Sequence, residues 1–183
     1  MRPIKDWSEI DNKEFDKEQT FEKSELAKEQ LRTAIWLFLN GIDFTSAITL
    51  AGASGNILHA LVEQQSKQPA LEYCRLLCSK LVGHVPGRSK YLKHFGDLTG
   101  INRLKHMSEK CPDTIEIDLE KSAETAIIRA VLDFIKLYGD TESRNNPAVN
   151  SFMQWLWVHD GEKMMKEYEA LPEELKGHEF RTA

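Results

Sequence analysis

The sequence lacks any long run of apolar residues. No stretch of the 183 residues approaches the roughly 18–20 apolar positions that a bilayer-spanning helix needs. The opening segment, MRPIKDWSEIDNKEFDKE, is rich in charge and has no apolar centre of the kind found in secretory signals. We therefore expect a cytoplasmic protein with no membrane partner.

Cysteine is also scarce, with Cys74, Cys78 and Cys111 the only three. Cys74 and Cys78 lie four residues apart on one face of an expected helix, without further Cys or His at spacings typical of a metal site. We therefore predict no metal and no cofactor, and interpret both thiols as small hydrophobic side chains. The sequence has neither a phosphate-binding glycine loop nor a nucleophile elbow.

Positive charge is confined mainly to the middle of an acidic chain. The net charge is −5, but residues 67–110 contain nine Lys and Arg against three acids. Such a segment either docks an anionic partner such as RNA or is paired internally with the acidic C-terminal third. The candidate RNA- or anion-binding residues are Arg88, Lys90, Lys93, Arg103 and Lys105.

Helical periodicity dominates the chain. Ala27, Leu31, Ala34, Ile35 and Phe38, for example, follow the spacing of an amphipathic helix. Glycine, proline and capping residues predict helix ends, which gives helices over about 21–40, 43–65, 69–82, 89–108 and 119–138, a loop over 140–147 and a sixth helix around 152–157.

These segments predict an all-α, single-domain bundle of five to six helices, with a short extended segment near 114–118. We expect a charged N-terminal arm (1–20), a bundle domain (21–160) and a charged, helical C-terminal tail (161–183). Within the second helix Ala47, Ala51 and Gly55 recur every four residues. A stripe of small residues of this kind lets another helix approach closely.

The stretch INRLKH, residues 101–106, carries the strongest candidate for chemistry. On a continuous helix over 89–108, Asn102 and His106 both project from the apolar side, with Leu98 and Phe95. A buried Asn or His needs hydrogen-bond partners. The pair therefore either holds the bundle in register or lines a cleft where His106 acts as acid and base near neutral pH.

The segment GIDFTSAITLAGASGNILHALV resembles the opening of HEPN-like helical domains, which are bundles of four or five helices. Asn102-Arg-Leu-Lys-His106 matches part of their signature, Arg-Asn, three residues and His. With the following CPDTIEID, a further helix and the Phe152–Trp155 element, residues 24–158 also resemble a group of uncharacterised bacterial proteins. The position of the family's arginine is occupied by Ile101.

The resemblance implies a function in RNA biology. In HEPN-like ribonucleases the arginine and the histidine are thought to meet across a dimer interface and cleave RNA without metal. Because Ile101 replaces that arginine, we expect a catalytically degenerate homodimer that binds RNA, a nucleotide or a partner protein. The alternatives are a metal-independent ribonuclease of the toxin or phage-defence type, with His106 and Asn102 as its catalytic residues, and a non-enzymatic homodimeric interaction module.

Overall fold

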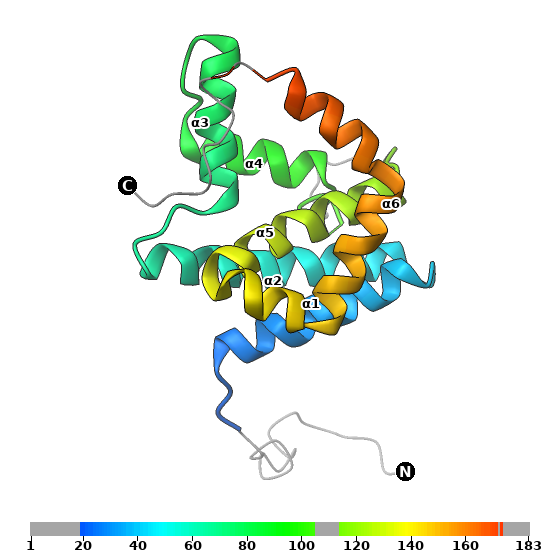
Figure 1. The fold of residues 1–183 in the computed structure, drawn as a ribbon. Coiled ribbons are helices and arrows are strands. Elements are labelled where there is room, and N and C mark those ends of the chain that lie inside the picture. The colour runs from blue at the N-terminus through cyan, green and yellow to red at the C-terminus, as the bar shows by residue number, and fades with distance from the viewer. Residues whose placement is uncertain (1–18, 105–113, 172, 174–183) are drawn as a thin grey trace, which may run out of the picture.

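The computed structural model describes residues 19–104, 114–171 and 173, and every regular element in these ranges is a helix (Figure 1). This confirms the predicted all-α bundle. Residues 114–118, the expected extended segment, form neither helix nor strand. The helices are α1 (Lys23–Leu39), α2 (Phe44–Gln64), α3 (Ala70–Val82), α4 (Arg88–Leu98), α5 (Leu119–Asn145) and α6 (Pro147–Glu169). Within the described part of the chain no helix is long and apolar enough to cross a bilayer.

The core lies where α1, α2 and α5 pack together, with α6 crossing them (Figure 1). Phe38 of α1 contacts α6 through two rings, with centroids 5.8 Å from Phe152 and 4.8 Å from Trp155. The largest fully buried apolar side chains come from all four helices and include Leu31, Ile35, Ile48, Leu58, Ile127, Phe134 and Phe152. Burial of this apolar surface is the main favourable term in folding.

The small residues of α2 are what let its neighbours approach. Ala47, Ala51 and Gly55 are all buried, and a Cβ added at Gly55 would lie 3.5 Å from the Cβ of Ala130 in α5. On the side facing α1, the Ser54 hydroxyl donates a 2.8 Å hydrogen bond to the carbonyl of Ala27. The predicted close approach along this stripe is therefore confirmed.

Several helix ends follow from the capping residues in the sequence. Asp43 Oδ1 accepts a 3.0 Å hydrogen bond from the Ser46 amide, as an N-cap does. Gly83 ends α3 with a φ of +79°, a conformation that glycine adopts without strain. Pro69, expected as the first helical residue of α3, is instead its N-cap.

The predicted fourth helix over 89–108 is wrong over 99–104, because α4 ends at Leu98, and 105–108 lie outside the described residues. Gly100 has a φ of +74°, and a Cβ there would lie 2.3 Å from Ile117 Cδ1, so only glycine fits. The chain then turns and buries Ile101 against α2, where a Cβ on Gly52 would lie 2.8 Å from Ile101 Cγ2. Ile101, at the position of the family's arginine, is thus a core residue.

The predicted loop over 140–147 is also wrong. Gly139, with a φ of +83°, interrupts α5 as expected, but helix resumes and continues to Asn145. Asn146 then caps α6, its Oδ1 accepting a 3.1 Å hydrogen bond from the Val149 amide. α6 continues to Glu169, past the expected boundary between bundle and tail at 160/161.

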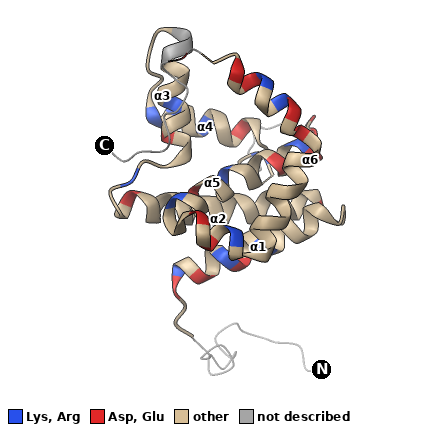
Figure 2. Ribbon diagram, in the orientation of Figure 1, with Lys and Arg blue, Asp and Glu red and all other residues tan. Residues whose placement is uncertain are grey.

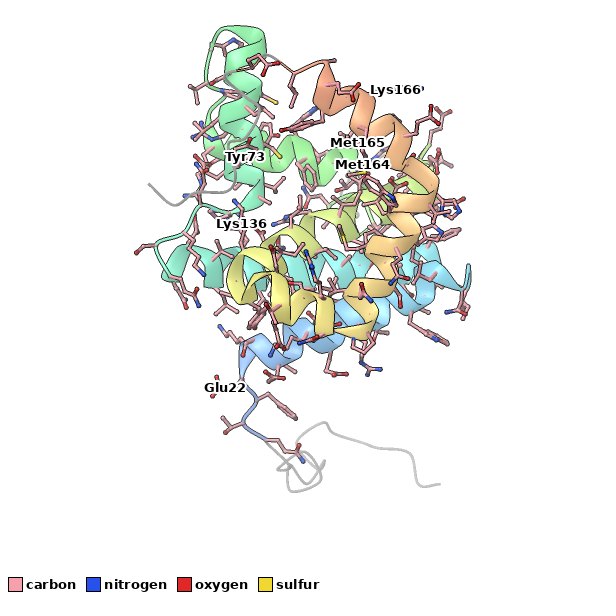
Figure 3. The ribbon with its side chains drawn as sticks, in the orientation of Figure 1. Glu22, Tyr73, Lys136, Met164, Met165 and Lys166 are labelled. Atoms are coloured by element: carbon pink, nitrogen blue, oxygen red, sulfur yellow. The ribbon has the colours of Figure 1, made fainter. Side chains whose placement is uncertain are left out.

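Residues 70–98, here called the α3–α4 arm, contact the end of α2 and the middle of α5, since Arg88 pairs with Glu63 and the Ala70 amide donates to Asp133 (Figure 1). Reciprocal bonds fasten the preceding linker: Lys67 Nζ donates to the Lys136 carbonyl at 2.9 Å, and Lys136 Nζ donates to the Gln68 carbonyl. The Lys136 ammonium also lies 5.7 Å from the centroid of the Tyr73 ring (Figure 3). Burial lowers the pKa of Lys136 to about 8.

Cys74 and Cys78 are half-buried free thiols on α3. Burial raises the pKa of Cys74, so its reactive thiolate is disfavoured. This fits their interpretation as small hydrophobic side chains. Cys111 lies outside the described residues.

Candidate functional site

Asn102 lies in the turn after α4, not on a helix face. Its backbone N–H donates to the Gly96 carbonyl at 3.1 Å, and its side-chain Nδ2 donates to Asp97 Oδ1 at 3.3 Å. The side chain rests on Gly96, where a Cβ would come within 2.4 Å of Asn102 Nδ2. His106 and Lys105, also expected site residues of this stretch, lie outside the described residues.

The remaining candidate anion-binding residues do not gather at one place. Arg88 pairs with Glu63 of α2 and lies 3.9 Å from Glu72 of α3. Lys90 and Lys93 are exposed on α4. Arg103 Nη1 donates to the carbonyl of Glu116 at 3.4 Å.

The basic segment is thus partly neutralised from within. Arg75 also forms an ion pair, at 2.5 Å from Glu72. The acids that pair with Arg75 and Arg88 belong to α2 and α3, rather than to the C-terminal third that was one of the two alternatives considered for the basic segment. Figure 2 shows acidic and basic positions interspersed along α1 and α6.

A small pocket with polar and apolar lining lies where the α3–α4 arm meets α2 and α5, and we call it the arm pocket. Its volume is about 150 Å³. Asn102 is one of its lining residues. Asn56 also lines it and is the lining residue that is exposed to solvent. The full lining comprises Asn56, His59, Leu71, Leu92, Gly96, Ile101, Asn102 and Arg129.

Arg129 is the buried cation of the arm pocket, with only 8% of its surface exposed. Its Nη2 donates to Asn56 Oδ1 at 2.9 Å, and its guanidinium lies 5.7 Å from the centroid of the Phe95 ring. Its Nε has no hydrogen-bond partner and passes over Gly55, where a Cβ would lie 3.6 Å away. Burial lowers the pKa of Arg129, and the nearby Asp133 carboxylate only partly opposes this shift.

His59 and Asp133 lie close together beside Arg129, and both are buried. Asp133 is fully buried, and its Oδ1 accepts a 2.7 Å hydrogen bond from the Ala70 amide at the start of α3. Its Oδ2 lies 3.9 Å from His59 Nδ1, too far for a hydrogen bond, and both atoms are without a partner in the described structure.

Burial sets the charge states of this pair. It lowers the pKa of His59 and raises that of Asp133, each shift being opposed by the charge of the other residue. His59 is therefore neutral at pH 7, with one ring nitrogen free to donate and the other to accept. Its Nε2 faces Arg88 Nη2 at 3.4 Å.

Sequence reasoning did not select Asn56, His59, Arg129 or Asp133 as site residues. A signal was present. Arg129 and Asp133 are charged residues four apart, so they share a helix face, and they interrupt the apolar pattern of Ile127, Ala130 and Phe134. The pairing of that face with His59 is set by tertiary packing.

A wider hollow of about 420 Å³ lies between the end of α4 and the start of α5. Its lining carries both signs of charge, including Arg103, Glu116 and Lys121. Lys121 is already paired, with Glu124 at 2.7 Å and Asp160 at 3.4 Å. We therefore regard the arm pocket as the candidate site.

In the part of the chain that the structure describes, no group of three or more His, Cys, Asp and Glu residues is placed to hold a metal ion. Comparison of the chain with protein-family models, with curated proteins and with solved structures finds no match.

Proposed function

We propose that this chain is a HEPN-like helical module that binds the phosphate of an RNA or a nucleotide in the arm pocket. The observation that carries the proposal is Arg129. A guanidinium offers five N–H donors, and this one is buried and lines a cavity. A buried cation in this state is stabilised when an anion enters the cavity beside it.

The neighbouring polar groups suit the same ligand. The Asn102 amide lines the pocket, and neutral His59 supplies either a donor or an acceptor. Asp133 opposes anion binding, but it is not part of the lining. Its raised pKa and the hydrogen bond from Ala70 both limit the negative charge presented to the cavity.

Binding of a labelled single-stranded RNA and of a labelled nucleotide at low salt tests the proposal, because phosphate contacts are strongest there. We expect Arg129→Met to weaken binding at least about tenfold, a loss of about 1.4 kcal/mol. The matched control is Arg32→Met, since Arg32 is an exposed arginine of α1 paired with Glu29. No binding by the wild type, or equal losses in both variants, would refute the proposal.

Metal-independent RNA cleavage is the second candidate, and the His59–Asp133 pair favours it. A neutral histidine backed by a carboxylate, with an arginine in the same pocket, is a residue set suited to acid–base chemistry on a phosphodiester. Cleavage assays in EDTA should include His59→Gln and His106→Ala, both checked for folding. Activity lost in folded His59→Gln would establish cleavage at this pocket, whereas no activity in the wild type would exclude it.

A homodimer through α6 is a further arrangement that exposed apolar side chains favour. Trp157 is 62% exposed and Val158 78% exposed, and Met164 and Met165 lie further along the helix (Figure 3). Light scattering of the wild type and of Trp157→Ser measures this directly. A monomeric wild type would exclude the dimer, and a dimer that Trp157→Ser dissociates would support it.

A further inference from the structure

The size of the arm pocket limits what can enter it. Its volume is only about 150 Å³. Pockets that bury a drug-sized ligand measure about 300–1,000 Å³. A phosphorus atom with its four oxygens fits the smaller volume, but a nucleobase together with its sugar does not.

The walls of the pocket divide into a polar and an apolar part. Buried Leu71 and Ile101 and half-buried Leu92 offer no hydrogen bonds, so they leave the inner space to a compact group held by Arg129. Asn56 is the exposed lining residue and marks the mouth. A ligand that enters past Asn56 meets the Arg129 guanidinium directly, since the two side chains are hydrogen-bonded.

The geometry of the pocket favours a phosphate at the end of a nucleic-acid strand over a phosphodiester within the strand. An internal phosphodiester continues in two directions, so both flanking sugars would have to leave by the same mouth. A phosphomonoester continues in one direction only. It also presents three strong acceptor oxygens and a charge of about −1.5 to −2 at pH 7, which matches a pocket lined by a buried guanidinium.

We propose that the arm pocket takes the terminal phosphate of a nucleotide or of an RNA end, with the sugar and base remaining outside, past Asn56. This inference rests on the proposed function and narrows it. Arg129 holds the phosphate oxygens by charge-assisted hydrogen bonds, and Asn102 and His59 contact the oxygens that remain.

The test uses one single-stranded RNA sequence in three forms: with a 5′-phosphate, with a 3′-phosphate, and with hydroxyl groups at both ends. Affinities are measured at low salt for the wild type, Arg129→Met and Asn56→Ala. We expect at least one phosphorylated form to bind about tenfold or more tightly than the hydroxyl form. Inorganic phosphate should compete with it, and Arg129→Met should abolish the difference.

Asn56→Ala alters an exposed side chain and therefore keeps the test usable if Arg129→Met fails to fold. It should reduce the advantage of the phosphorylated form. The preferred form identifies which end is bound. Equal affinity for all three forms, with a uniform loss in Arg129→Met, would overturn the terminal-phosphate inference while leaving phosphate binding intact. Absence of binding by every form would overturn the proposed function itself.

Discussion

Helix α5 buries side chains on two sides, and the chemistry of the two sides differs. Toward α1 and α2 it presents apolar residues such as Ile127 and Phe134, packed against other apolar groups. Toward the α3–α4 arm it presents Arg129 and Asp133, which contact Phe95 and the Ala70 amide. The first side accounts for the fold. The second side adds buried charge that an apolar core does not need.

Buried groups without a hydrogen-bond partner are concentrated on the second side. Around the arm pocket three buried atoms lack a partner: His59 Nδ1, Arg129 Nε and Asp133 Oδ2. Elsewhere in the described residues Gln30 Oε1 of α1 and Tyr138 Oη of α5 also lack one, whereas the buried Ser54 hydroxyl has one. Each group without a partner costs about 1–3 kcal/mol of stability. The simplest reason for a chain to keep unpaired polar groups beside a cavity is that a ligand bound there forms hydrogen bonds with the lining.

The largest effect should come from the apolar side. Phe134 is 1% exposed, and Phe134→Ala should lower the free energy of unfolding by about 3–5 kcal/mol through lost burial and a cavity. Urea denaturation measures this. Val158→Ala, at a position 78% exposed, is the control and should stay within about 0.5 kcal/mol. A loss below about 1 kcal/mol for Phe134→Ala would place this residue outside the core.

The contact between Ile101 and α2 can be tested by overpacking. Gly52→Val should cost about 1–3 kcal/mol, since even a Cβ at this position would lie 2.8 Å from Ile101 Cγ2. In an Ile101→Ala background the same substitution should cost markedly less. Additive losses in the double variant would show that the turn after α4 does not pack on Gly52.

The polar side of α5 should make the free energy of unfolding depend on pH. The pKa of His59 is lowered in the folded chain below its ordinary value of 6.5, so the unfolded chain binds the proton more readily. The groups that face it are Asp133, Arg129, Glu63 and Arg88. The contribution of His59 to stability should therefore fall as pH drops below about 6.5, by about 1.4 kcal/mol for each unit by which its pKa is lowered, while the raised pKa of Asp133 acts in the opposite direction.

Urea titrations between pH 7.5 and pH 5 of the wild type and of His59→Gln measure this effect. The His59→Gln profile should be flatter over this interval. Equal slopes for the two proteins would show that His59 does not carry the linkage. A steeper slope in His59→Gln would contradict the direction of the shift.

The smallest change in stability is expected at Gly96. A Cβ there would lie 2.4 Å from Asn102 Nδ2, so Gly96→Ala should displace Asn102 from the pocket wall. Alanine favours helix over glycine by about 1 kcal/mol, which offsets much of the cost. We expect stability within about 1 kcal/mol of the wild type and weaker RNA or nucleotide binding. Unchanged binding would remove Asn102 from the site.

The helices were predictable where the determinants are local. Apolar residues at helical spacing place α1 and α2, and Asp43 and Gly83 mark ends that their own conformations explain. The end of α4 was not predictable in this way. It depends on the packing of Ile117 against Gly100 and of Ile101 against Gly52. These are contacts between residues distant in the sequence.

The candidate site was predictable only in fragments. Asn102 was singled out, but from a helix that stops before reaching it. His59 and Asp133 are 74 positions apart. No local pattern predicts that the packing of α2 on α5 places His59 Nδ1 3.9 Å from Asp133 Oδ2. Ile101 was noted as a departure from the HEPN-like signature, and the structure supplies its physical role as a buried apolar contact.

The most direct test of the account is to measure stability and ligand affinity together for Arg129→Met. Replacement of Arg129 by an apolar side chain of similar length removes the positive charge near buried Asp133 and the hydrogen bond to Asn56, so it should lower the free energy of unfolding by about 1–3 kcal/mol. Affinity for phosphorylated RNA should fall at least about tenfold in the same preparation. A loss of stability with affinity unchanged would show that Arg129 is a structural residue and that the arm pocket is not the binding site.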